Sequence, residues 1–162
     1  MRKRCKRKVR HVLTNPVKFV LDGFVPMASM EEDVERLRIK NHGALQLIVS
    51  GKASRTDVDV LIAAVNMAVA IKDTCGLGKE YEKALDDMHS ATYCMARRGL
   101  HTDRFIFTGP ELRAINEGME VHDAQIDACT VREIEEASRY VKKRISSGKA
   151  RVITADLNQP QP

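Results

Sequence analysis

The sequence predicts an all-α protein, a bundle of about five helices, on the basis of three observations. Aromatic residues make up only 4% of the 162 residues and tryptophan is absent, so the apolar volume comes from Ala, Val, Ile, Leu and Met, which suits packing between helices. Apolar residues recur at steps of three and four, and several runs open with a helix-capping pattern. Because the length suits one domain, we place a single helical domain at residues 12–157.

Five runs of helical spacing follow one another along the chain. Some of them open with a Ser or Thr that can accept from a helix N–H, and an acid three residues later that reaches back, as in Ser29 with Glu32 and Thr130 with Glu133. The run 56–73 is apolar nearly all round, so we expect it to be the central, buried helix of the bundle. The predicted helices cover residues 29–49, 56–73, 79–98, 108–126 and 130–147.

The segments between and around these runs also carry information. Residues 15–28 hold too many apolar side chains for a free linker, so we expect a short helix or an extended strap docked on the body. Gly99 is expected to end the third helix. Phe105–Phe107 is the best strand candidate, and it could pair with Arg151–Ile153 as a two-stranded appendage. Residues 158–162 are expected to form a loose tail.

The positive charge of the chain is concentrated at its beginning. The formal net charge is +5, yet the first ten residues hold seven of the 27 basic residues and no acid, so the remaining 20 basic residues face 22 acids. We therefore predict that residues 1–11 form a disordered basic arm, because like charges repel each other and the segment has few apolar side chains to bury. A solvated tail and attraction to anionic membranes are alternatives. We expect the arm to bind nucleic acid through Arg2, Lys3, Arg4, Lys6, Arg7, Lys8 and Arg10.

Polar residues stand at positions where the helical stripes call for apolar ones. His122 falls within one stripe, Asn41 within another, and Asn66 interrupts the apolar run of the central helix. Because buried polar groups need partners, we predict that these residues meet in one network. The network either fixes the register of the helices or lines a pocket, in which His122 would carry a proton. Its predicted members are Asn41, His42, Asn66, His122, Asp123 and Gln125.

No motif for a cofactor, a metal ion or a catalytic nucleophile is complete. The glycine segments 51–54 and 76–79 lack the second glycine of a phosphate-binding loop. Asp86 with His89 has the spacing of half a di-metal site, but the glutamates that such a site needs on the other helices are missing. We therefore expect no cofactor and no metal ion, and the sequence favours a non-enzymatic protein without deciding the question.

Two absences in the sequence bear on the compartment. The apolar stretch after the basic residues is interrupted by polar ones, so it does not form a secretory leader, and no stretch is long enough to span a bilayer. The four cysteines form no CxxC pair and no disulfide framework. These features predict a cytoplasmic protein with reduced thiols and no membrane partner.

Several residues together carry a resemblance. They are Asn41-His42-Gly43-Ala44-Leu45, the turn 51–57, Asn66, Glu111-Leu112 and His122-Asp123-Ala124-Gln125. Over most of its length the chain resembles uncharacterised small helical proteins encoded by bacteriophages, prophages and other mobile elements of proteobacteria. The resemblance implies an accessory gene product that acts on nucleic acid or on a host protein, and it implies no catalytic residues.

Three functions follow as expectations. The first is a non-enzymatic accessory protein, whose body contacts proteins, including further copies of itself in a homo-oligomer, and whose arm binds nucleic acid. The second is an inhibitor or modulator of a host protein. The third is a small ligand-binding or enzymatic bundle centred on His122.

Overall fold

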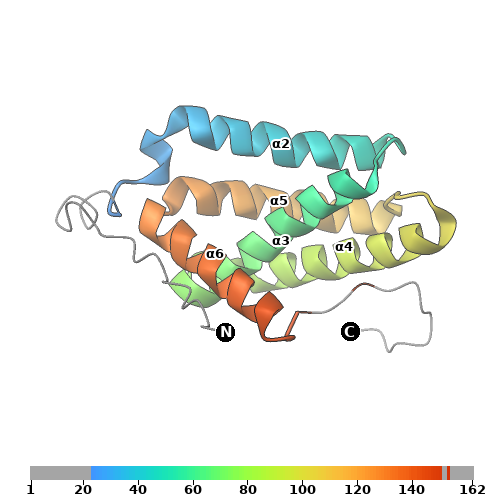
Figure 1. Cartoon of the computed structure of the whole chain (residues 1–162). Helices are drawn as coiled ribbons and strands as arrows, with labels where there is room; N and C mark the ends of the chain where they lie inside the picture. Colours follow the sequence, from blue (N-terminus) through green and yellow to red (C-terminus); the bar gives the residue numbers. More distant parts are fainter. Residues whose placement is uncertain (1–22, 151–152, 154–162) are drawn as a thin grey trace, which may run out of the picture.

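The computed structural model describes residues 23–150 and Ile153, and in this part of the chain five α-helices form one bundle (Figure 1). The predicted all-α class is confirmed, whereas the basic arm 1–11 and the tail 158–162 lie outside the described residues. The helices are α2 (Glu31–Val49), α3 (Arg55–Cys75), α4 (Glu82–Thr102), α5 (Gly109–Ala128) and α6 (Val131–Ser146), with short 3-10 turns η1 (Met27–Ser29) and η2 (Lys79–Tyr81).

Helix α3 lies at the centre of the bundle and packs against α2, α4, α5 and α6 (Figure 1). The prediction of a central apolar helix at 56–73 is therefore confirmed. Its start differs slightly, because Ser54 is the N-cap and forms a capping box with Asp57. The hydrogen bonds from Ser54 lower the pKa of Asp57. At the other end, Gly76 adopts a left-handed conformation with φ of 75° and closes the helix.

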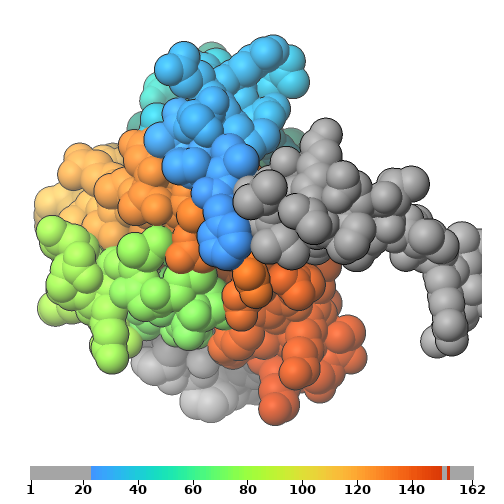
Figure 2. Space-filling model, turned by 90° about the vertical axis from the view of Figure 1, so that its left-hand side faces the viewer, coloured from blue at the N-terminus to red at the C-terminus, as the bar shows by residue number. Residues whose placement is uncertain are grey.

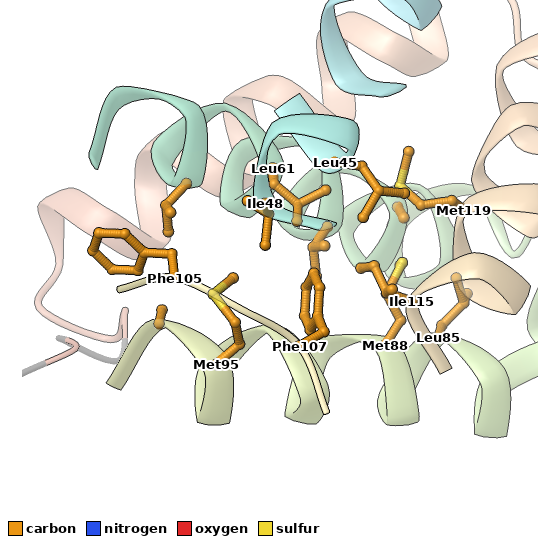
Figure 3. Close-up of a cluster of buried hydrophobic side chains, with 14 residues drawn as sticks. Leu45, Ile48, Leu61, Leu85, Met88, Met95, Phe105, Phe107, Ile115 and Met119 are labelled. Carbon is orange, nitrogen blue, oxygen red and sulfur yellow. The ribbon is translucent and has the colours of Figure 1, made fainter. Parts of the chain in front are cut away.

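Two hydrophobic clusters fill the space around α3. The larger one joins α2, α3, α4 and α5 with the connection between α4 and α5 (Figure 3). The smaller one joins the end of α3 to α5 and α6. Aliphatic and methionine side chains supply most of this volume, as the composition predicted, and two phenylalanines add to it. The larger cluster includes Leu45, Ile48, Leu61, Leu85, Met88, Met95, Phe105, Phe107, Ile115 and Met119, and the smaller one Val34, Ala70, Ile71, Ile126, Cys129 and Ala137.

The predicted strand at Phe105–Phe107 is wrong, because these residues form no strand. The rings of Phe105 and Phe107 are 6% and 9% exposed and insert into the larger cluster instead (Figure 3). Between them, the carbonyl of Ile106 accepts a hydrogen bond from Nη2 of Arg98 at 2.8 Å. Burial of two aromatic rings outweighs the hydrogen bonds of a short two-stranded ribbon, which is marginal by itself.

The expectation that Gly99 ends the third helix is also wrong. Helix α4 continues to Thr102 and is closed by Asp103, which has a positive φ of 52°. Gly99 has a different role, because the ring of Phe105 lies where a Cβ of residue 99 would stand. Gly118 of α5 makes the same kind of close approach to Met88 of α4. Both glycines are therefore required by packing.

The segment before α2 forms the strap that the sequence predicted, as far as it is described. The N–H of Met27 donates to the carbonyl of Cys129 at 2.8 Å, and the N–H of Val131 donates to the carbonyl of Val25 at 3.0 Å. Pro26 forms a single bridge with Thr130. These bonds hold the strap against the junction of α5 and α6, where Figure 2 shows it as the blue segment in contact with orange.

The predicted caps have mixed outcomes. Thr130 with Glu133 forms the expected capping box, and Thr108, where a helix start was expected, forms one with Glu111 as well. The box predicted at Ser29 is wrong, because its hydroxyl donates to the carbonyl of Pro26 at 2.7 Å and α2 begins at Glu31 without a side-chain cap. Ser29 is therefore part of a turn within the strap and does not cap α2.

Substitution by alanine should change the stability in opposite directions at two glycines, Gly99 of α4 and Gly43 of α2. The variant Gly99→Ala forces Phe105 to move and should lower the free energy of unfolding by about 1 to 3 kcal/mol. The variant Gly43→Ala meets no atom within 4 Å and should raise it by about 0.5 to 1 kcal/mol. Urea denaturation of both variants checks this, and a Gly99→Ala protein as stable as the parent would contradict the close packing.

Candidate functional site

The first group of predicted site residues lies on the surface seam between α2 and α5. Nε2 of His42 is 2.8 Å from Oδ2 of Asp123, so this predicted pair is brought together. Arg38, which the sequence reasoning missed, donates from Nη2 to Oδ2 of Asp127 at 2.7 Å and to the carbonyl of Asp123 at 3.2 Å. The bond to Asp127 raises the pKa of Arg38. These contacts hold α2 and α5 in register, and their side chains do not line a pocket.

A second contact joins α5 to the end of α3. The amide of Gln125 is 3% exposed, and its Nε2 donates to the carbonyl of Ala68 at 3.1 Å and to that of Leu77 at 2.8 Å. Gly78 leaves room for this side chain, because a Cβ there would meet Nε2 at 2.9 Å. Gln125 therefore fixes the turn after α3 against α5.

His122 lies one turn before Gln125 and is buried, with 1% of its surface exposed. Neither ring nitrogen has a hydrogen-bond partner among the described residues. Burial lowers the pKa of His122, although Asp123 and the side chain of Gln125 act in the opposite direction. The imidazole is therefore neutral near pH 7. Its position inside the core keeps bulk water and dissolved substrates away from it.

The predicted single network is wrong, because Asn66 lies elsewhere. Asn41 is buried on α2 at 4% exposure, but half-buried Asn66 lines a groove that faces α4 and α6. The body of α3 separates this groove from the seam that contains His42 and Asp123. Polar interruptions in a stripe predicted burial, but they could not predict which side of α3 each residue faces.

The groove is lined by α3 as its floor, by α4 and α6 as its walls, and by residues after α6 at one end. Its volume is about 570 Å³. The floor and the α6 wall are largely apolar, whereas the α4 wall adds polar groups. The lining residues include Ile62, Val65, Asn66, Val69, Asp86, His89, Thr92, Tyr93, Tyr140, Val141, Arg144, Ile145, Lys149 and Ile153.

Positive charge dominates the rim of this groove. The carboxylate of Asp86 is 3.6 Å from Nζ of Lys72, but that ammonium also lies 2.9 Å from Glu82 and 3.8 Å from Asp73. Arg144 stands over the ring of Tyr140 at 5.7 Å and donates to its hydroxyl at 3.2 Å. That hydroxyl donates in turn to Oδ2 of Asp73 at 3.2 Å. Among the lining residues, the two bases Arg144 and Lys149 therefore outnumber the single acid Asp86 beside an apolar floor.

The outer surface of α6 continues this positive charge. Arg139, Lys142 and Lys143 stand at spacings of three and four, so they share one exposed face of the helix. None of them forms an ion pair with another described residue, and the same holds for Arg144 and Lys149. We call these five residues the α6 basic patch. Sequence reasoning missed it because charge was summed over the whole body, yet residues 139–151 hold six basic residues and no acid.

A second cavity, of about 530 Å³, lies between α5 and the turn that leads from α3 into η2, and it has the opposite character. Glu80, Glu117 and Glu120 line it together with Tyr81. Throughout residues 23–150, no group of three His, Cys, Asp or Glu side chains is placed to hold a metal ion. This cavity is unsuited to an anionic ligand, so the groove and the α6 basic patch form the candidate site.

The predicted arm residues Arg2 to Arg10 lie outside the described part of the chain, so their contacts are not placed. No helix among the described residues is both long and apolar enough to cross a membrane.

The burial of neutral His122 predicts an acid-dependent loss of stability. The pKa of His122 is lowered in the folded state, so the unfolded state binds the proton more readily and stability falls as the pH drops below about 6.5. Between pH 7.5 and 5.5 the parent protein should lose up to roughly 1.4 kcal/mol more than His122→Gln. The exposed His101→Gln serves as the control and should behave like the parent. Urea denaturation at both pH values measures this, and equal losses in all three proteins would exclude a neutral His122.

Comparison with known proteins supplies no further constraint on this site. No family model, curated protein or solved structure matches the chain. Its function is therefore inferred from the placement of its charges and its groove.

Proposed function

We propose that the chain is a non-enzymatic, nucleic-acid-binding accessory protein of a phage or mobile element. In this proposal the helical body presents the α6 basic patch and the N-terminal arm adds a second cationic segment. The observation that carries it is the clustering of five exposed cations on and just after α6 with no ion-pair partner among the described residues. The resemblance to proteins of mobile elements gives the biological setting.

For this proposal, the clustering of the cations on α6 carries more weight than their lack of ion-pair partners. Other exposed cations, such as Lys40 and Lys52, are also free of ion pairs in the described structure, but acids stand within five residues of each. In the patch, Glu135 and Glu136 precede Arg139 by one turn, whereas no acid follows it up to residue 151. Elsewhere, ion pairs such as Lys83 with Asp87 neutralise the charge locally. A cluster of cations without acids binds phosphates by releasing the counterions condensed on the nucleic acid, and this gain grows with the number of phosphates neutralised.

The helix dipole offers a simpler account of part of the patch. Acids such as Glu133 at the start of α6, and bases at its end, each stabilise the helix by about 0.3 to 1 kcal/mol. The dipole acts within the last turn, so it does not account for Arg139, which lies two turns earlier, or for Lys149, which lies beyond the helix. Phosphate binding accounts for all members of the patch together with the arm.

Contact with proteins, including further copies of the chain, stays part of the proposal for the body. Light scattering at several concentrations measures the oligomeric state, and a monomer at all of them would remove self-association. The enzymatic alternative centred on His122 has little support, because His122 is buried and lines neither of the two cavities.

The α6 basic patch predicts a specific loss of nucleic-acid affinity. The triple variant Arg139→Gln/Lys142→Gln/Lys143→Gln should bind a labelled oligonucleotide more weakly and flatten the dependence of log affinity on log salt by about 2 to 3 units. A second variant that lacks residues 2–10 should also lose affinity for the oligonucleotide. Fluorescence anisotropy measures the affinity of both variants between about 50 and 200 mM salt, because the contribution of phosphate contacts falls strongly over this range.

The matched control changes the same charge elsewhere on the body. The variant Lys40→Gln/Lys52→Gln/Arg55→Gln also removes three exposed cations, and it should keep most of the affinity. If both triple variants lose affinity equally, the patch has no special role. If the full chain binds neither DNA nor RNA at moderate salt, the proposed function is wrong.

A further inference from the structure

We infer that the groove between α3, α4 and α6 receives an unpaired nucleobase, so that the nucleic acid bound by this protein is single-stranded. The inference rests on the proposed function and deepens it by naming the class of nucleic acid. Its basis is a cavity with an apolar floor whose rim is continuous with the α6 basic patch.

The groove has the size and the composition of a ligand site. Its volume of about 570 Å³ lies within the range of about 300 to 1,000 Å³ that is usual for such sites. The half-buried Ile62 and Val69 on the floor offer apolar surface to the face of a base, and the half-buried Val141 lines the α6 wall. The half-buried Asn66 places an amide in the same lining, where the polar edge of a base needs hydrogen-bond partners.

The charge of the rim selects an anionic ligand. Arg144 and Lys149 line the groove and belong to the α6 basic patch, so phosphates on either side of an inserted base would meet further cations on α6. Asp86, the acid in the lining, shares the ammonium of Lys72 with Glu82 and Asp73, so Lys72 compensates it only in part. Arg144 and Lys149 still outnumber it in the lining. A neutral apolar ligand would make no use of these cations, whereas a nucleotide uses both the floor and the rim.

Apolar side chains at the groove are left exposed to water. Ile145 of α6 lines the groove and is 60% exposed, which is high for a large aliphatic side chain. The half-buried Val141 lies one turn before it. In a duplex the faces of the bases are stacked and paired, so they cannot cover these side chains. A single strand can turn a base outward into such a groove, as single-strand binding surfaces do with aromatic and apolar platforms.

The test compares three probes of equal length on the full chain: an oligothymidylate, the same strand with abasic sites, and a duplex. All three carry phosphates, but the oligothymidylate alone offers unpaired bases. We expect it to bind at least about fivefold more tightly than the abasic strand, the smallest change expected from one stacked base. We expect a similar advantage over the duplex at the same salt concentration.

Two substitutions assign the effect to the groove. Val69→Trp fills it and should remove the preference for the oligothymidylate, while Val121→Trp, at a half-buried valine that lines the acidic cavity, should keep it. Because a buried tryptophan could disturb folding, the exposed Ile145→Ser provides a second variant that should weaken the preference without loss of helical circular dichroism. Affinity for the duplex should be unchanged in Ile145→Ser.

The outcomes separate the inference from the proposed function. Equal affinity for all three probes, or a preference that survives both Val69→Trp and Ile145→Ser, would overturn the groove site and leave phosphate binding in place. Failure of all three probes to bind would overturn the proposed function, and the groove site with it.

Discussion

The burial of α3 is the constraint on which the rest of the structure depends. This helix is apolar on nearly every side, so it has to be covered by neighbours, and α2, α4, α5 and α6 all pack against it. Where α4 and α6 diverge, α3 stays partly uncovered and becomes the floor of the groove. The same feature therefore stabilises the fold and creates its most ligand-like cavity. Asn66 is the polar residue of α3 that faces this opening.

Polar residues inside the bundle fix its arrangement at some cost. A buried polar atom without a partner costs about 1 to 3 kcal/mol, and the two nitrogens of His122 lack partners among the described residues. Gln125 is satisfied at one end, because its Nε2 donates to the carbonyls of Ala68 and Leu77, while its Oε1 has no partner among the described residues. Such bonds are satisfied in one register of α5 against α3. Specificity of packing is the simplest role for these residues.

Much of the fold could be predicted from the sequence because the decisive interactions are local. Capping at Thr108 and Thr130 involves residues three apart, so the pattern is visible in the chain. The failures concern distant contacts. Gly99 was expected to end a helix because the approach of Phe105 is a tertiary contact that no local pattern shows. The side of α3 that Asn66 faces depends in the same way on where α4 and α6 pack.

The missed basic patch has an electrostatic explanation. The described body and its flanks are slightly acidic on average, which argues against binding a polyanion if the charge is treated as one number. In solution, however, charges separated by more than about 8 to 10 Å are largely screened at physiological ionic strength. A phosphate near Lys142 is therefore attracted by Arg139 and Lys143 and is little affected by Glu117, which lies on another helix at the acidic cavity. Local clusters, and not the net charge, decide where nucleic acid binds.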